Sequence, residues 1–345
     1  MKECLDYLKI ESRAVECRAC NHFCRIADGH TGICGVRENQ GGTLRLLVYG
    51  AAVAVNIDPI EKKPLFHFLP ASKVFSFGTL GCNFRCDNCQ NYDISQMFGR
   101  KAYIVKYSEL DMRENYPPAK IIEAAVKTGC ESIAYTYNEP TVFIEYALDT
   151  MKLARASGLK NVWVSNGFMS TATLDRIIPW LDAINVDIKS FSDDFYSTNC
   201  GAKLSPVLDN CRRLAQEKVW LEITTLIIPT LTDSEAMLMR IAEFIKEELG
   251  DFVPWHVSAF SGAIAWKLKR LDDTPASSIK RAYDIGRETG LKYVYAGNIP
   301  SGEMENTVCQ SCSEIVIGRR GYDIERRDKK GACPRCGAKI AGFWS

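Results

Sequence analysis

The chain has 345 residues, 43 of them basic and 42 acidic, so its formal net charge is only +1. A chain of this length can bury one large core and still carry one or two small modules. The balanced charge gives no signal for a nucleic-acid partner or an anionic membrane. No apolar run approaches the length of a membrane span, and the first residues lack the apolar core of a secretory signal, so we expect a cytoplasmic protein.

Cysteine is abundant, with 15 residues. In a chain without an export signal, so many cysteines indicate metal ligation, because the cytosol keeps thiols reduced. Eleven of them fall into three sets along the chain.

The first set has the spacing C-x2-C-x3-C-x9-C and lies in a segment rich in turn-forming residues. Its members are Cys17, Cys20, Cys24 and Cys34. Four cysteines on short loops can wrap one metal centre. The spacing matches neither a common ferredoxin run nor a zinc finger, so zinc, an auxiliary iron–sulfur cluster and free thiols all stay open. His22 or His30 could replace a cysteine as ligand.

The second set, Cys82, Cys86 and Cys89, has the spacing C-x3-C-x2-C on one short run. Three thiolates on a tight loop can hold a four-iron four-sulfur (4Fe-4S) cluster with one iron left open to a small molecule. The alternative is structural zinc with a fourth ligand from elsewhere. Structural zinc normally has four closed ligands, and no downstream residue stands at zinc-finger spacing, so we favour the cluster.

Alternating strands and helices follow. Short β-branched or aromatic runs predict strands at residues 74–80, 132–138, 161–166, 183–189, 220–228 and 254–260, with a seventh at 292–297. Helical patterns lie between them at residues 118–128, 142–157, 171–180, 205–217, 234–249 and 277–289. This alternation predicts βαβ units and a parallel sheet, either a barrel or an open doubly wound sheet.

Polar residues recur where the predicted strands end, and there ligands collect in parallel sheets. They are Asn138, Glu139, Ser165, Asn166, Gly167, Asp187, Lys189, Glu222, Thr224, His256 and Ser258. Each alone is as well explained by a turn or a helix cap. Their recurrence after consecutive strands favours a site. His256 is either an acid/base or substrate contact or a structural hydrogen-bonding residue.

The third set consists of two C-x2-C pairs separated by twenty residues, Cys309 with Cys312 and Cys333 with Cys336. This spacing is typical of a zinc ribbon, with a rubredoxin-like iron site as the alternative. A closed thiolate site would fold a tail too short for its own core. We therefore predict three parts, an N-terminal cysteine-rich module (1–70), a catalytic domain (71–300) and a zinc-ribbon-like module (301–345).

The cysteine loop directly after the first of six βα units resembles the radical S-adenosylmethionine (radical SAM) enzymes. The resemblance implies an α/β fold, a partial (β/α)6 TIM-like barrel, with SAM chelating the open iron of the cluster. It implies that Asn138 and Glu139 bind the SAM amino group, and that Ser165, Asn166 and Gly167 contact its ribose or carboxylate. Asp187 and Lys189 resemble the D-x-K strand of glycyl-radical activating enzymes, and Ile228 the apolar contact to adenine.

Nearly the whole chain resembles the radical SAM component of the AmmeMemoRadiSam system, with pyruvate formate-lyase activating enzymes as broader relatives. The resemblance rests on the first and third cysteine sets and on residues 58–64, 81–91, 254–256 and 295–298. It implies reductive cleavage of SAM to a 5′-deoxyadenosyl radical that takes a hydrogen atom from a partner protein or a small metabolite. An electron donor such as a ferredoxin or flavodoxin is implied too.

Two other functions remain. A non-catalytic metal-binding scaffold would use its cysteine modules to dock a partner and would not cleave SAM. An RNA-modifying radical SAM enzyme would use the basic runs at residues 319–320 and 326–330. A solvated basic face is the commoner meaning of such runs, so we expect no nucleic-acid partner.

Overall fold

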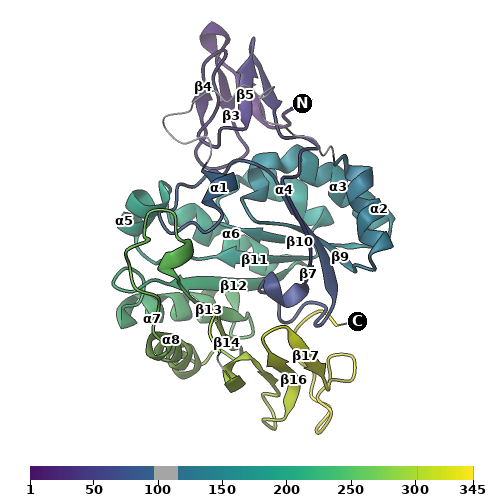
Figure 1. Cartoon of the computed structure of the whole chain (residues 1–345), viewed down its shortest axis with the longest axis vertical. Coiled ribbons are helices and arrows are strands. Elements are labelled where there is room, and N and C mark those ends of the chain that lie inside the picture. The colour runs from purple at the N-terminus through teal and green to yellow at the C-terminus, as the bar shows by residue number, and fades with distance from the viewer. Residues whose placement is uncertain (97–115, 301, 345) are drawn as a thin grey trace.

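The computed structural model describes residues 1–96, 116–300 and 302–344. Its central sheet has the strand order β14-β13-β12-β11-β10-β9-β8-β7. Strands β8 to β14 run parallel, and β7 lies antiparallel along β8. The sheet does not close, because β14 and β7 are its two edges (Figure 1). The predicted α/β architecture, a partial barrel, is therefore confirmed.

The strands of this sheet are β7 (Ala54–Pro59), β8 (Lys73–Gly78), β9 (Ser132–Tyr135), β10 (Lys160–Ser165), β11 (Ala183–Asp187), β12 (Trp220–Ile227), β13 (Trp255–Ala259) and β14 (Val294–Gly297). The helices are α1 (Tyr92–Ser95), α2 (Pro118–Lys127), α3 (Ile144–Ala156), α4 (Thr171–Ile177), α5 (Asp193–Phe195), α6 (Ser205–Gln216), α7 (Glu235–Phe244) and α8 (Ala276–Thr289). Every predicted strand and helix coincides with one of these elements. The antiparallel strand β7 was not predicted.

Local sequence explains where the helices begin and end. Pro118 starts α2, where the missing N–H costs nothing. Ser170 caps α4, its side chain accepting a hydrogen bond from the N–H of Thr173 at 3.2 Å. Helix α8 ends at Gly290, which adopts a left-handed φ of 101°. None of the described helices is both long and apolar enough to span a bilayer.

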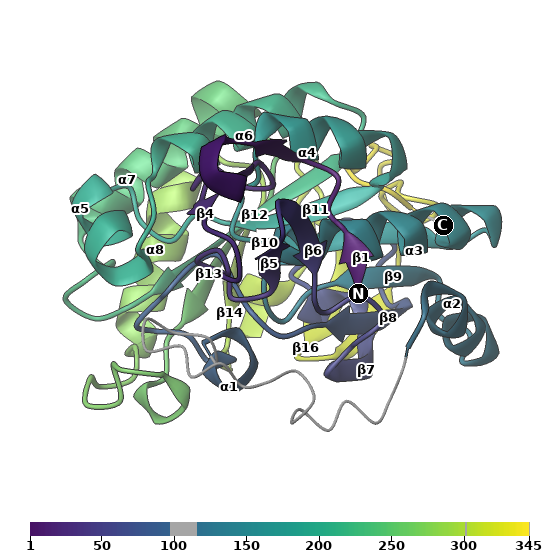
Figure 2. The ribbon, with the colours of Figure 1, turned by 90° about the horizontal axis from the view of Figure 1, so that it is seen from above.

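Two small sheets form the N-terminal module, which caps the central sheet (Figure 2). Their strands are β1 (Lys2–Glu3), β2 (Tyr7–Lys9), β3 (Val15–Cys17), β4 (Arg25–Ile26), β5 (Arg37–Gln40) and β6 (Thr43–Leu46). The module packs on the segment between β10 and α4, since Asn21 Nδ2 donates to the carbonyl of Met169 at 2.7 Å. It therefore lies over the carboxyl ends of the strands.

The C-terminal module is a three-stranded sheet of β15 (Thr307–Val308), β16 (Ile315–Arg320) and β17 (Asp323–Arg326). It lies at the opposite end of the long axis from the N-terminal module (Figure 1). The two modules thus meet different regions of the central domain.

Residues 60–72 connect β7 to β8, and we call residues 60–69 of this connection the floor loop. Ile60, Leu65 and Phe68 form a buried cluster with residues of β8 to β11. Two backbone N–H groups of the loop, those of Phe66 and His67, donate to the Glu222 carboxylate at 3.0 and 2.8 Å. Strand β7 and the floor loop fall within the range predicted for the N-terminal module, yet they belong to the central sheet and its core. The three proposed boundaries stay a prediction.

Candidate active site and metal centres

The second cysteine set lies in the loop after β8, at the carboxyl end of the sheet. Asn138, which follows β9, holds this loop through its side chain: Nδ2 donates to the carbonyl of Gly81 at 2.6 Å. Its Oδ1 accepts from the N–H of Thr79 at 3.3 Å. At Gly78 a Cβ atom would lie 2.5 Å from the carbonyl oxygen of Thr136, so only glycine allows the two strand ends to approach so closely.

The loop presents its three sulfur atoms in a sheltered setting. Cys82 and Cys86 are buried and Cys89 is half-buried. Burial raises the pKa of Cys82 and of Cys89. Thiols in such a place ionise only beside positive charge, so bound iron suits the loop better than free thiolates do. The donor set of three cysteines therefore fits a 4Fe-4S cluster with one open iron.

A π-helical turn, η5 (Tyr196–Cys200), supports the loop from the other side. The N–H of Arg85 donates to the carbonyl of Cys200 at 2.8 Å, and that of Asp87 to the carbonyl of Asn199 at 3.0 Å. These bonds fix the loop between the ends of β9 and β11.

The predicted cofactor residues after β9 and β10 form one buried hydrogen-bond network. The Glu139 carboxylate accepts from the N–H and hydroxyl of Thr141 at 3.1 and 2.6 Å, from Ser165 Oγ at 3.0 Å and from the N–H of Asn166 at 2.8 Å. Burial raises the pKa of Glu139. Asn166 Nδ2 then donates to Asn83 Oδ1 in the cysteine loop at 2.7 Å. The network thus ties two strand ends to the loop.

Asp187 and Lys189 lie at the same edge. Lys189 Nζ is 3.0 Å from Asp187 Oδ2. Burial opposes the charge on Lys189, but the neighbouring Asp187, Cys86 and Cys200 raise its pKa well above the usual range. The ammonium is therefore a fixed positive charge beside the cysteine loop. Ser190 Oγ, three residues after β11, and Thr224 Oγ1, in the neighbouring strand β12, are buried without a hydrogen-bond partner within the described ranges.

Two predicted residues are not tied to this network. Ile228, directly after β12, is buried, and its N–H donates to Thr232 Oγ1 at 2.7 Å. His256 is the second residue of β13, and its Nε2 lies 2.7 Å from Glu222 Oε2. Its ring packs edge-on to Phe66 of the floor loop, with centroids 4.7 Å apart. His256 therefore belongs to a buried group with Glu222 and the floor loop, which we call the floor network. The structure does not bring it to the cysteine loop, because His256 lies near the amino end of β13 and the cysteine loop lies at the carboxyl ends of the strands.

The first cysteine set surrounds one cavity of about 20 Å³. Its lining includes Cys17, Cys20, Cys24 and Cys34, together with Arg37 and Asn83. His22 also lines the cavity, and its Nε2 is hydrogen-bonded to the carbonyl of Asn83 at 2.8 Å. His30 is exposed, with Nδ1 2.9 Å from the carbonyl of Asp28. The cavity thus joins the N-terminal module to the cysteine loop.

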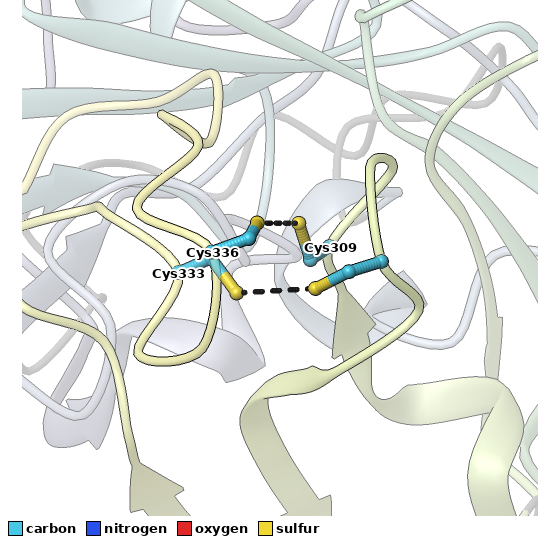
Figure 3. Close-up of side chains that lie close together, drawn as sticks. Cys309, Cys333 and Cys336 are labelled. Carbon is cyan, nitrogen blue, oxygen red and sulfur yellow. Dashed lines mark hydrogen bonds between the residues drawn. The ribbon is translucent and has the colours of Figure 1, made fainter.

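The third set forms the tightest group of ligand atoms among the described residues. The sulfur atoms of Cys309, Cys312, Cys333 and Cys336 all lie within 4.8 Å of one another. Two pairs, Cys309 with Cys336 and Cys312 with Cys333, are each 3.6 Å apart between sulfur atoms. Figure 3 labels Cys309, Cys333 and Cys336 of this group. Four sulfurs around one ion with bonds of 2.3 Å would be about 3.8 Å apart, so this group fits a single metal ion.

Sequence reasoning missed two residues of these sites. Arg37 is 1 % exposed, and its Nη2 donates to Glu145 Oε2 at 2.6 Å. Asn83 is equally buried between the cavity and Asn166. From the sequence, an arginine in a short strand is expected at the surface, so no pattern predicts that Arg37 is a buried residue of this site. Asn83 directly follows a predicted ligand, and that position was the available signal.

Residues 77–244 match the family model "Radical SAM superfamily". "Uncharacterized protein MJ0808" of Methanocaldococcus jannaschii is 40% identical over 347 residues, covering 99% of each chain. A "Pyruvate formate-lyase-activating enzyme" of Clostridium pasteurianum is 26% identical over 183 residues, which is 51% of this chain and 72% of the relative. A solved radical SAM methyltransferase from Sphaerobacter thermophilus has a TM-score of 0.49 and 14% identity, covering 68% of this chain and 70% of the other.

The matched residues run from the end of β8 to the end of α7 and include the cysteine loop and every strand end that carries the polar network. Members of this superfamily are enzymes that use a 4Fe-4S cluster and SAM, and the loop of this chain has the donor set for that cluster. Residues 77–244 of this chain belong to the radical SAM superfamily.

Proposed function

We propose that this enzyme cleaves SAM reductively at a 4Fe-4S cluster held by Cys82, Cys86 and Cys89, and that its substrate is a partner protein. The observation that carries the proposal is the hydrogen-bond network that joins Asn138, Glu139 and Asn166 to the cysteine loop. Such a network holds three ligands rigidly beside strand ends where a second molecule can bind. Relatives named as activating enzymes of pyruvate formate-lyase and isethionate sulfite-lyase favour a protein substrate.

Held by Cys82, Cys86 and Cys89, a 4Fe-4S cluster would supply the single electron for reductive cleavage of SAM to methionine and a 5′-deoxyadenosyl radical, which would take a hydrogen atom from the substrate. The chain's own residues place and shelter the reactants. Lys189 offers a positive charge beside Cys86. The buried hydroxyl groups of Ser190 and Thr224 are donors without a partner in the described structure and can bind polar atoms of SAM or substrate.

We assign the remaining predicted residues in the same way. Asn138 and Glu139 position the SAM amino group, Ser165, Asn166 and Gly167 its ribose or carboxylate, and Ile228 its adenine. Asp187 holds Lys189. His256 sits in the floor network, so we assign it a structural role through Glu222.

The chain's system and partners are part of the proposal. Its cysteine sets and the runs at 58–64 and 254–256 support assignment to the AmmeMemoRadiSam system. A ferredoxin or flavodoxin would supply the electron. The sulfur spacing at the third cysteine set supports zinc bound by Cys309, Cys312, Cys333 and Cys336.

The test is anaerobic reconstitution followed by dithionite reduction and an assay for 5′-deoxyadenosine. We expect product from the full chain and none from Cys82→Ala, Cys86→Ala or Cys89→Ala, since each removes one of three cluster ligands. Cys130→Ala is the matched control, because Cys130 lies outside all three sets. Turnover in any of the three loop variants would contradict the proposal, and so would a wild-type chain that binds iron but leaves SAM intact.

RNA modification is a second candidate, but the basic runs are largely engaged within the protein. Arg319 is buried, donating to Thr307 Oγ1 at 2.7 Å and to the carbonyl of Phe66 at 2.8 Å. Arg326 pairs with Asp328, and Arg327 with Glu325. RNA retention that weakens steeply with salt would revive this candidate.

A further inference from the structure

The cavity of the N-terminal module contains more than four cysteines. Two residues of its lining, Arg37 and Asn83, each have a buried N–H donor without a hydrogen-bond partner in the described parts of the chain, namely Arg37 Nη1 and Asn83 Nδ2. Each side chain is 1 % exposed. A buried donor left unpaired is costly, so both groups imply an acceptor inside the cavity. The cavity thus has donors for an acceptor-rich ligand as well as sulfur ligands.

The sulfur spacing distinguishes this site from the third cysteine set. There all four sulfurs lie within 4.8 Å of one another, and no other trio of ligand atoms in the described residues gathers so tightly. A single zinc ion would draw its sulfurs to about 3.8 Å. A cluster of several iron and sulfide ions spreads its cysteine ligands further apart, and its sulfides accept hydrogen bonds. Cys17, Cys20, Cys24 and Cys34 do not form such a tight group, so they suit a cluster better than a single ion.

The electrostatics point the same way. Thiolate ligands carry negative charge, so a buried site made of them needs positive charge nearby. Arg37 supplies part of this positive charge. Its Nη2 lies 2.6 Å from Glu145 Oε2, so the guanidinium is itself paired with a carboxylate. Hydrogen bonds and buried charge of this kind set the potential of an iron–sulfur centre.

The cavity also adjoins the catalytic loop. Asn83, which lines it, is the residue directly after Cys82. The carbonyl oxygen of Cys34 would lie 2.5 Å from a Cβ atom on Gly81, the residue directly before Cys82, and Arg85 Nη2 donates to the carbonyl of Ile33. Cys34 of the first set thus approaches the residue before Cys82, and Asn83, which lines the cavity, is the residue after Cys82.

We propose that Cys17, Cys20, Cys24 and Cys34 bind a second iron–sulfur cluster, that Arg37 and Asn83 donate hydrogen bonds to its sulfur atoms, and that it relays single electrons to the cluster at Cys82, Cys86 and Cys89. An external one-electron donor of the ferredoxin or flavodoxin class reduces the second cluster. That cluster is then reoxidised as the catalytic cluster gains the electron. The relay role rests on the proposed radical reaction, whereas the metal site does not.

Metal analysis tests the site without reference to activity. The full-length triple variant Cys82→Ala/Cys86→Ala/Cys89→Ala, reconstituted without oxygen, should retain iron and sulfide for one cluster and a paramagnetic signal after reduction. In the otherwise wild-type chain, replacing the four N-terminal cysteines by Ala should remove one cluster's iron and leave the other's. Zinc in place of iron in the triple variant, or unchanged iron in the fourfold variant, would overturn the proposal.

The two donors have their own readout, the reduction potential of the second cluster. In the triple variant background, Arg37→Lys keeps the charge beside Glu145 but removes Nη1, and Asn83→Ala removes Nδ2. We expect each change to lower the midpoint potential, because fewer hydrogen bonds reach the sulfur atoms. Unchanged potentials in both variants would show that neither group faces the cluster.

The relay is tested by comparing reductants. In the fourfold variant, dithionite should still support 5′-deoxyadenosine formation, whereas a reduced ferredoxin should support far less than in wild type. Equal rates with both reductants in the variant would overturn the relay, and loss with both would do so too, since the defect would then lie in the catalytic site. Failure of wild type with both reductants would instead refute the proposed function and leave the metal result standing.

Discussion

The carbonyl oxygen of Cys34 approaches Gly81 so closely that a Cβ atom on residue 81 would lie 2.5 Å from it. Gly81 also has a left-handed φ of 85°, which other residues adopt at a cost. The N-terminal module and the loop that carries Cys82 are therefore in direct backbone contact, and this contact requires glycine.

Gly81→Ala should lower the free energy of unfolding by more than the roughly 1–3 kcal/mol of backbone strain alone, because the clash with Cys34 adds to it. Chemical denaturation and iron content measure the effect. Gly129→Ala is the control: Gly129 has a φ of 68° and nothing within 4 Å of its would-be Cβ. Equal losses in the two variants would mean that the contact with Cys34 is unimportant.

Lys189→Met should slow SAM cleavage by roughly tenfold or more, since it removes a positive charge beside Cys86 that favours the reduced cluster. Lys189→Arg keeps that charge and should retain most of the rate. Product formation under dithionite and the potential of the catalytic cluster are the measurements. A Met variant as fast as the Arg variant would remove Lys189 from the site.

Low pH should lower the free energy of unfolding of the central domain through His67, a residue of the floor loop. Its Nδ1 lies 2.6 Å from the carbonyl of Ala341 and its Nε2 2.5 Å from Tyr295 Oη, and burial lowers its pKa to about 4. An unfolded histidine titrates near pH 6.5, so between these values the unfolded chain binds the extra proton. Stability should therefore be complete above about pH 6.5 and fall by roughly 3 kcal/mol toward pH 4.

His67→Gln is the comparison, because glutamine does not titrate. Denaturation curves between pH 4 and 7 should show a smaller slope in the variant, whatever its absolute stability. Parallel pH profiles for the two proteins would assign the acid sensitivity to other groups, such as Glu222, whose buried carboxylate is held ionised by His256.

Disrupting the metal site that we propose at the third cysteine set should affect folding more than chemistry. Cys309→Ala or Cys333→Ala opens a closed thiolate site, so we expect a lower melting temperature and release of zinc. The rate of SAM cleavage per folded chain should stay near wild type, because this module lies at the far end of the molecule (Figure 1). A loss of turnover at unchanged stability would place the module in catalysis.

The hydrophobic periodicity of the sequence was sufficient to predict the parallel strands and the helices of the central domain. Strands such as β11, whose first four residues are buried, and helices with one apolar face were located from the sequence to within a few residues. Strand β7 was missed because its pattern, half exposed and interrupted by Asn56 and Pro59, is weak without its partner β8. Spacing identified the cysteine sets. Spacing could not identify Arg37 as a site residue, nor could it show that His256 lies outside the site. Both facts depend on contacts between segments that are distant in the sequence.

The floor loop is completed by the other end of the chain. His67 is bonded to Ala341, 274 residues away, and the N–H of Leu69 donates to the carbonyl of Phe343 at 2.8 Å. Contacts of such long range form late and slow the search for the native state. During synthesis the floor loop would therefore lack these partners until residues 341–343 emerge, so its backbone groups would stay exposed to solvent in the meantime.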